Sequence, residues 1–116
     1  MPIADSDSSI YLMSILDTVD AAALTEEAIR AIADRTLPHD KLVLFGSRAR
    51  GDARARSDFD LAVFPQTGFA DEDLIRFTDA LERSSKIIYP LDTVDTRTVS
   101  PATLEKIDNE GRVWKN

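Results

Sequence analysis

Two aspartates in this sequence have the type and spacing to bind a metal ion. Asp58 and Asp60 flank Phe59 at the start of an apolar run. Side chains two positions apart in a strand point to the same face, roughly 6–7 Å apart along the backbone. Two like charges this close favour a cation between them, and carboxylate oxygens are the ligands that a hard divalent ion prefers. The pair therefore predicts a divalent metal site.

A glycine-serine pair upstream has the character of a phosphate-binding turn. Gly46 and Ser47 follow the apolar run 41–45, and ten residues separate Ser47 from Asp58. A Gly-Ser turn after a strand lets the backbone approach an anion closely, with amide N–H groups and the hydroxyl as donors. Arg48, the basic residue nearest to Ser47, is our candidate for an additional phosphate contact. Turn and carboxylates together predict chemistry on a nucleoside triphosphate.

The combined spacing also resembles a known family. Gly46-Ser47, ten residues and then Asp58-x-Asp60 is similar to the signature of the nucleotidyltransferase superfamily with the DNA-polymerase-β-like fold. The resemblance covers residues 41–114 or so, and it implies that the turn binds ATP and that the aspartates bind two Mg2+ ions. Short chains of this kind resemble the minimal nucleotidyltransferases, which are often the antitoxins of HEPN-domain toxins.

The segment 91–95, Leu-Asp-Thr-Val-Asp, resembles the part of that family which supplies a third carboxylate. Asp92 and Asp95 are three positions apart and so face opposite sides of a strand, which means that only one of them can join Asp58 and Asp60. The resemblance aligns Asp92 with this role. It implies that Asp92 is a metal ligand and a candidate base for the attacking hydroxyl.

Composition narrows the possible functions. A chain of 116 residues with 43% hydrophobic content fits one globular domain, and the lack of cysteine excludes disulfide frameworks and thiolate zinc sites. The net charge of −7 argues against nucleic-acid binding. No apolar run approaches the ~18 residues of a membrane span, so we expect a cytoplasmic protein without membrane contact. Four arginines beside the Gly-Ser turn nevertheless form a small basic island suited to a triphosphate: Arg48, Arg50, Arg54 and Arg56.

Hydrophobic periodicity predicts alternating helices and strands. The expected helices are 25–37, 47–53, 71–84 and 101–110, and the expected strands are 41–45, 58–64, 87–94 and a short final one at 113–114. Pro90 within the third strand indicates an edge position. This order predicts an α/β (α+β) fold, a small mixed sheet with helices packed mainly on one side. The resemblance implies that this is the polymerase-β-like nucleotidyltransferase fold. We expect residues 1–22 to be an N-terminal extension, partly disordered or in contact with a partner through 10–16, and 23–116 to be the minimal nucleotidyltransferase domain.

The resemblance implies a function for this domain. AMP from ATP would be moved onto a tyrosine hydroxyl of a HEPN toxin, which the chain would silence as its antitoxin within a hetero-oligomer. Two alternatives stay open. One is an antitoxin that neutralises its toxin by binding alone; the other is transfer to a small molecule such as an aminoglycoside, which the expected lack of a second domain disfavours.

Overall fold

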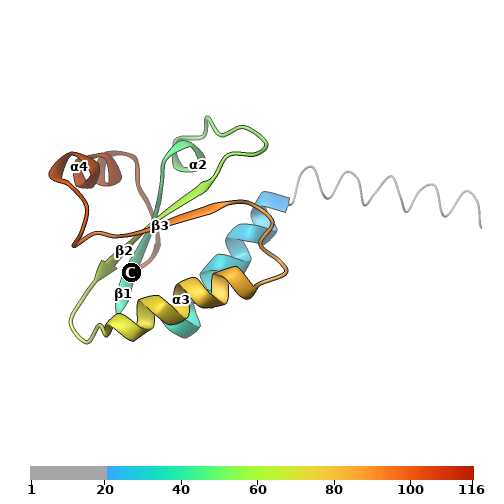
Figure 1. Cartoon of the computed structure of the whole chain (residues 1–116). Helices are drawn as coiled ribbons and strands as arrows, with labels where there is room; N and C mark the ends of the chain where they lie inside the picture. Colours follow the sequence, from blue (N-terminus) through green and yellow to red (C-terminus); the bar gives the residue numbers. More distant parts are fainter. Residues whose placement is uncertain (1–20) are drawn as a thin grey trace, which may run out of the picture.

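A four-stranded mixed sheet forms the centre of the computed structural model, which describes residues 21–116 (Figure 1). The spatial order is β3-β2-β1-β4. β1 pairs antiparallel with both β2 and β4, whereas β2 and β3 are parallel. The strands are β1 (Asp40–Phe45), β2 (Phe59–Pro65), β3 (Leu91–Asp95) and β4 (Arg112–Lys115). The predicted mixed sheet is confirmed.

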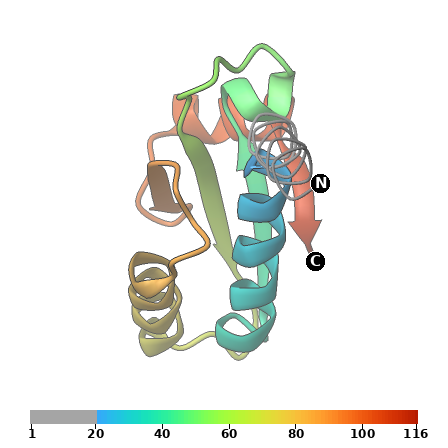
Figure 2. The ribbon, with the colours of Figure 1, turned by 90° about the vertical axis from the view of Figure 1, so that its right-hand side faces the viewer.

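Helices cover the two faces of this sheet unequally. Helix 21–36 and α3 (Asp71–Arg83) lie side by side on one face, and α4 (Pro101–Glu110) lies on the other (Figures 1 and 2). The single turn α2 (Ser47–Arg50) follows β1 directly. The structure therefore agrees with the prediction that the helices pack mainly on one side of the sheet, and α4 is the exception.

The alternation of side chains along β2 separates the core from the candidate site. Leu61 and Val63 are fully buried with Ile29 of helix 21–36 and Phe77 of α3. Ala62 points the other way and packs in a smaller cluster with Ile107 of α4. Because residues two apart share a face, the Asp60 side chain lies on the face that carries α4 and not beneath the two long helices.

Two element boundaries differ from the sequence prediction. The predicted strand 87–94 begins only at Leu91, because Pro90 lacks an N–H for the ladder; its carbonyl instead accepts the Phe59 N–H at 3.0 Å, where the pairing of β2 with β3 starts. The edge position of β3 is confirmed. The predicted helix 47–53 ends at Arg50, since Gly51 adopts the left-handed conformation with φ 88°.

The last helix forms as its sequence predicts. The Ser100 hydroxyl accepts the Thr103 N–H at 3.2 Å, Pro101 occupies the first turn, and Gly111 follows the last helical residue. Segment 10–16 and most of the expected extension 1–22 lie outside the described residues. Within 21–116, no helix combines the length and the apolar character that crossing a membrane requires.

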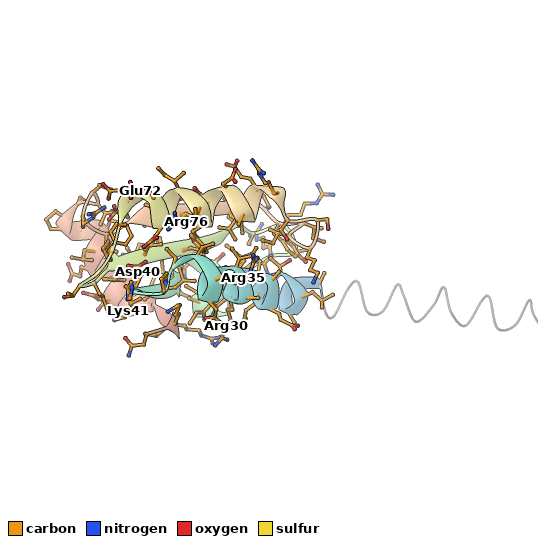
Figure 3. All side chains as sticks on the ribbon, turned by 90° about the horizontal axis from the view of Figure 1, so that it is seen from below. Arg30, Arg35, Asp40, Lys41, Glu72 and Arg76 are labelled. Atoms are coloured by element: carbon orange, nitrogen blue, oxygen red, sulfur yellow. The ribbon has the colours of Figure 1, made fainter. Side chains whose placement is uncertain are left out.

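One buried carboxyl group was not predicted by the sequence. Asp40 begins β1 and is only 2% exposed, and neither of its carboxylate oxygens has a hydrogen-bond partner of good geometry. It lies at the end of the molecule where α3 begins, the end that also carries Glu72 and Arg76 (Figure 3). Burial raises the pKa of Asp40, and this is only partly offset by the Gln66 backbone N–H.

The Asp40→Asn substitution should therefore raise the free energy of unfolding at neutral pH, by about 1 kcal/mol, because it removes a buried charge without a full set of partners. The folded-state pKa lies above the unfolded value of 3.8, so the penalty in the wild type shrinks as the pH falls through the raised pKa and is absent below 3.8. Urea unfolding at several pH values measures both effects. Asp34→Asn, which neutralises an exposed aspartate, is the control; an Asp40→Asn variant that is less stable than the wild type at pH 7 would contradict this account.

Candidate functional site

The parallel pairing of β2 with β3 brings two of the predicted carboxylates together. Asp60 is directly opposite Asp92 in the register, so both side chains emerge on the same face of the sheet. Asp58 precedes β2 by one residue and Asp60 by two. Asp60 is half-buried, whereas Asp58 and Asp92 are exposed. The sheet therefore places all three predicted carboxylates at the start of β2 and β3.

Electrostatic repulsion connects these three groups. Burial raises the pKa of the Asp60 carboxyl, and the negative charges of Asp92 and Asp58 raise it further. Lys106 of α4 and Arg50 offset part of this effect. The negative charges around Asp60 thus exceed the positive ones, and a cation bound at this end of the sheet would relieve the repulsion.

The donor set fits a hard divalent cation in chemistry and charge. All three side chains offer carboxylate oxygens, the ligands that Mg2+ prefers. Among residues 21–116, however, no three His, Cys, Asp or Glu side chains converge closely enough to hold one ion. The backbone brings the carboxylates to one place while their side chains stay apart, so shared metal ligation by Asp58, Asp60 and Asp92 stays a prediction.

The glycine of the Gly-Ser turn packs directly against Asp60. Phe45, the residue before Gly46, is opposite Asp60 in the β1–β2 register. Gly46 has φ 76° and ψ −159°, a conformation that essentially only glycine adopts. A Cβ atom at this position would overlap the Asp60 carboxylate and lie 3.1 Å from its Cγ. The turn can therefore approach the carboxylates only because residue 46 has no side chain.

Ser47 starts the helical turn next to this contact. The Gly46 carbonyl accepts the N–H groups of Ala49 at 3.1 Å and Arg50 at 3.0 Å, which closes α2. The Ser47 carbonyl in turn accepts the N–H of Gly51 at 3.0 Å. Ser47 is thus held by the backbone beside the Gly46–Asp60 contact. Its role as a phosphate donor stays a prediction.

Glu110, at the end of α4, is a site neighbour that the sequence analysis missed. Its carboxylate accepts the Gly46 N–H at 3.3 Å and a guanidinium N–H of Arg50 at 3.0 Å. One acidic side chain therefore binds both the turn and the basic island. Gly46 and Glu110 are 64 positions apart, so no local spacing in the sequence could have indicated this contact.

Arg48 occupies a different place from the one its sequence position suggested. Its guanidinium carbon lies 4.4 Å from the ring centroid of Phe59 and 4.5 Å from that of Tyr89. Its Nε donates to the Ser57 carbonyl at 3.0 Å. The predicted phosphate contact of Arg48 is untested, and the structure adds a packing role that the sequence did not indicate.

The second aspartate of β3 is committed to another interaction. Asp95 is opposite Val63, a core residue, whereas Asp92 is opposite Asp60. The Arg97 guanidinium donates to the Asp95 carboxylate at 2.7 Å and holds its pKa below the usual range. Arg97 also binds Asp71 at 3.0 Å and so connects β3 to the start of α3. Asp92 is thereby the carboxylate of β3 that shares a face with Asp60.

Comparison with known proteins gives one family and several similar structures. Residues 27–115 match the family described as "Polymerase beta, Nucleotidyltransferase". A solved structure of a proposed minimal nucleotidyltransferase is 31% identical with a TM-score of 0.56, over 72% of this chain and 86% of that one. No curated protein sequence matches the chain significantly.

Two solved complexes share the fold at lower identity. One is a tri-AMPylated HEPN toxin of Shewanella oneidensis with its MNT antitoxin, matched at 20% identity and a TM-score of 0.56 over 79% of this chain and 70% of that one. The other is a toxin–antitoxin with AMP-PNP, matched at 23% identity and a TM-score of 0.56 over 77% and 71%.

Substituting Gly46 by alanine tests the contact between the turn and Asp60. We expect Gly46→Ala to lower the free energy of unfolding by about 2 kcal/mol or more, because the backbone conformation is strained for alanine and the Cβ displaces the carboxylate. Gly51→Ala is the matched control, since Gly51 also has a positive φ but open space around it. It should cost only the strain, about 1 kcal/mol.

The Asp60→Ala background separates the two contributions. If the carboxylate clash matters, Gly46→Ala should cost less in the Asp60→Ala protein than in the wild type, in denaturant unfolding of all four proteins. An equal cost in both backgrounds would show that Gly46 and Asp60 are not in contact.

Proposed function

The chain belongs to the polymerase β-type nucleotidyltransferase family, and we propose that it transfers AMP from ATP to a tyrosine hydroxyl of a HEPN toxin and so acts as that toxin's antitoxin. The observation that carries the proposal is the pairing of Asp60 with Asp92, with the Gly46 turn packed against Asp60. This arrangement combines carboxylates of the kind that bind Mg2+ with a backbone turn suited to phosphate. The family match supports the reaction class, and the similar complexes support the choice of partner.

In the proposed reaction, the residues of this chain bind and orient ATP. The Gly46-Ser47 turn would bind the phosphates through the Ser47 N–H and hydroxyl, with Arg48 as a weaker candidate for this role. Asp58, Asp60 and Asp92 would hold two Mg2+ ions. When bound, these ions supply charge neutralisation of the triphosphate and polarisation of the α-phosphate. Glu110, which binds the Gly46 N–H, would keep the turn in place.

The bond changes are those of an in-line displacement. The oxygen of the acceptor hydroxyl forms a bond to the α-phosphorus, the bond from that phosphorus to the bridging oxygen breaks, and pyrophosphate leaves. We assign the hydroxyl proton to the Asp92 carboxylate, which is exposed at the edge strand where an acceptor can approach. The reaction therefore needs Asp92 ionised before transfer.

A HEPN toxin is the acceptor that a similar solved complex favours. The similar Shewanella oneidensis complex joins an MNT antitoxin to an AMPylated HEPN toxin. We propose the same arrangement here, a hetero-oligomer in the cytoplasm, where ATP is available.

The proposal is tested by incubating the protein with ATP, Mg2+ and the product of the neighbouring gene, and then measuring the mass of that product. A gain of one AMP unit is expected. Asp58→Asn with Asp60→Asn should abolish the gain and leave the fold intact or stabler, because repulsion within the site is removed. The control is Asp34→Asn with Asp108→Asn, which neutralises two exposed aspartates outside the site and should leave transfer unchanged.

Two additions to this experiment, an assay of toxin activity and an aminoglycoside as a second acceptor, distinguish the alternatives. An inhibited toxin without added mass would indicate an antitoxin that works by binding alone. Transfer to an aminoglycoside but not to the neighbouring product would indicate a small-molecule enzyme. Full transfer by the double asparagine variant would exclude Asp58 and Asp60 as the metal-binding pair.

A further inference from the structure

The guanidinium of Arg48 lies where the three segments of the candidate site meet. Arg48 itself follows Ser47 in the Gly-Ser turn. Its Nε donates to Ser57, the residue before Asp58, at 3.0 Å. Its guanidinium carbon lies over the rings of Phe59 and Tyr89, 4.4 and 4.5 Å from their centroids. Arg48 therefore belongs to the segment of the Gly-Ser turn and contacts the two segments that carry the carboxylates. One of these contains Asp58 and Asp60, and the other contains Asp92.

The aromatic partners are themselves close to the carboxylates. Phe59 stands between Asp58 and Asp60 and is only 3% exposed. Tyr89 is three positions before Asp92, and its ring centroid is 5.6 Å from that of Phe59. The next residue, Pro90, accepts the Phe59 N–H at 3.0 Å and so begins the β2–β3 pairing. A shift of the Arg48 side chain would therefore be transmitted to both strands that carry the carboxylates.

The chemistry of this contact requires arginine. The planar guanidinium can lie against aromatic rings and donate from Nε at the same time, which a lysine ammonium cannot do. One terminal nitrogen, Nη2, is buried without a hydrogen-bond partner, which costs free energy. The arginine is retained in this position by its contacts with the two rings and Ser57, and not by full satisfaction of its donors.

We propose that Arg48 is a positioning residue, which sets the spacing between the Gly-Ser turn and the carboxylates Asp58, Asp60 and Asp92. This inference rests on the proposed function, because it assigns a role within the same site. It also differs from the role that the sequence suggested, in which Arg48 binds phosphate directly. The two roles make opposite predictions for metal binding in the absence of nucleotide.

The sign of the effect on metal affinity separates the two roles. Removing a positive charge beside carboxylates strengthens their attraction for a cation. If Arg48 only binds phosphate, its loss should therefore leave Mn2+ binding unchanged or make it tighter. Loss of a positioning residue should weaken Mn2+ binding despite the lost charge, because the carboxylates are no longer held together. Supporting residues around metal sites typically change the affinity 10- to 100-fold, so we expect about a tenfold loss.

The experiment measures Mn2+ binding to the full chain by electron paramagnetic resonance, without ATP and without a partner. We expect Arg48→Met, Arg48→Lys and Tyr89→Leu each to weaken binding about tenfold. Two control variants should not weaken Mn2+ binding. Tyr89→Phe keeps the ring, and Arg56→Met removes an exposed arginine from the segment between α2 and β2. Hydrogen exchange of the Phe59 amide is measured on the same proteins and should accelerate only in the first three.

Each outcome decides the proposal. Equal or tighter Mn2+ binding in Arg48→Met and Arg48→Lys would overturn it in favour of a direct phosphate role. Weaker binding in Arg56→Met to the same degree would also overturn it. If the wild type itself binds no Mn2+, the proposed function fails. In that case, hydrogen exchange of the Phe59 amide decides on the role of Arg48 separately. Unchanged protection of this amide in Arg48→Met would show that Arg48 does not organise these segments.

Discussion

Repulsion between Asp60 and Asp92 is the constraint around which the rest of this structure is arranged. The parallel register places the two residues opposite each other, so their side chains emerge on the same face of the sheet. Asp60 is half-buried, and its raised pKa shows that its ionised form is disfavoured by burial and by its acidic neighbours. The divalent cation that we propose for this site would relieve this concentration of negative charge.

One face of the sheet packs against the main hydrophobic core, and the opposite face carries the candidate site. Leu61 and Val63 are buried beneath the two long helices, so the main core holds β2 rigidly from one side. Asp60 lies on the other face, where α4 covers the sheet only in part through Ile107. A rigid strand holds charged side chains in fixed positions more precisely than a flexible loop does. At the start of β2, these side chains lie on the face opposite the two long helices.

Contacts from distant parts of the chain hold the turn against this end of the sheet. Gly46 fits against Asp60 because it lacks a side chain, and Glu110 binds the Gly46 N–H from the end of α4. Arg48 connects the turn to the aromatic residues beside the carboxylates. Each contact restricts the position of Ser47 relative to Asp60 without using either residue's side-chain oxygen. Both groups stay available for ligands.

The sequence indicated those parts of the candidate site that local spacing encodes. The Gly-Ser turn and the aspartate pair Asp58 and Asp60 were visible because strand periodicity and glycine chemistry act over a few residues. The roles of Arg48 and Glu110 were not visible, because they depend on partners that only the fold brings near. Apolar content misled the prediction of strand 87–94, where Pro90 delays the start of β3.

The central claim, that Asp60 is held in the negative field of Asp92, is tested most directly by titrating the Asp60 carboxyl carbon by NMR. The account predicts that Asp60 in the wild type titrates above the ordinary value of 3.8 and that Asp92→Asn lowers its pKa. Asp95→Asn, on the opposite face, should leave it unchanged. A wild-type Asp60 pKa at or below the ordinary value, with no response to Asp92→Asn, would contradict the account.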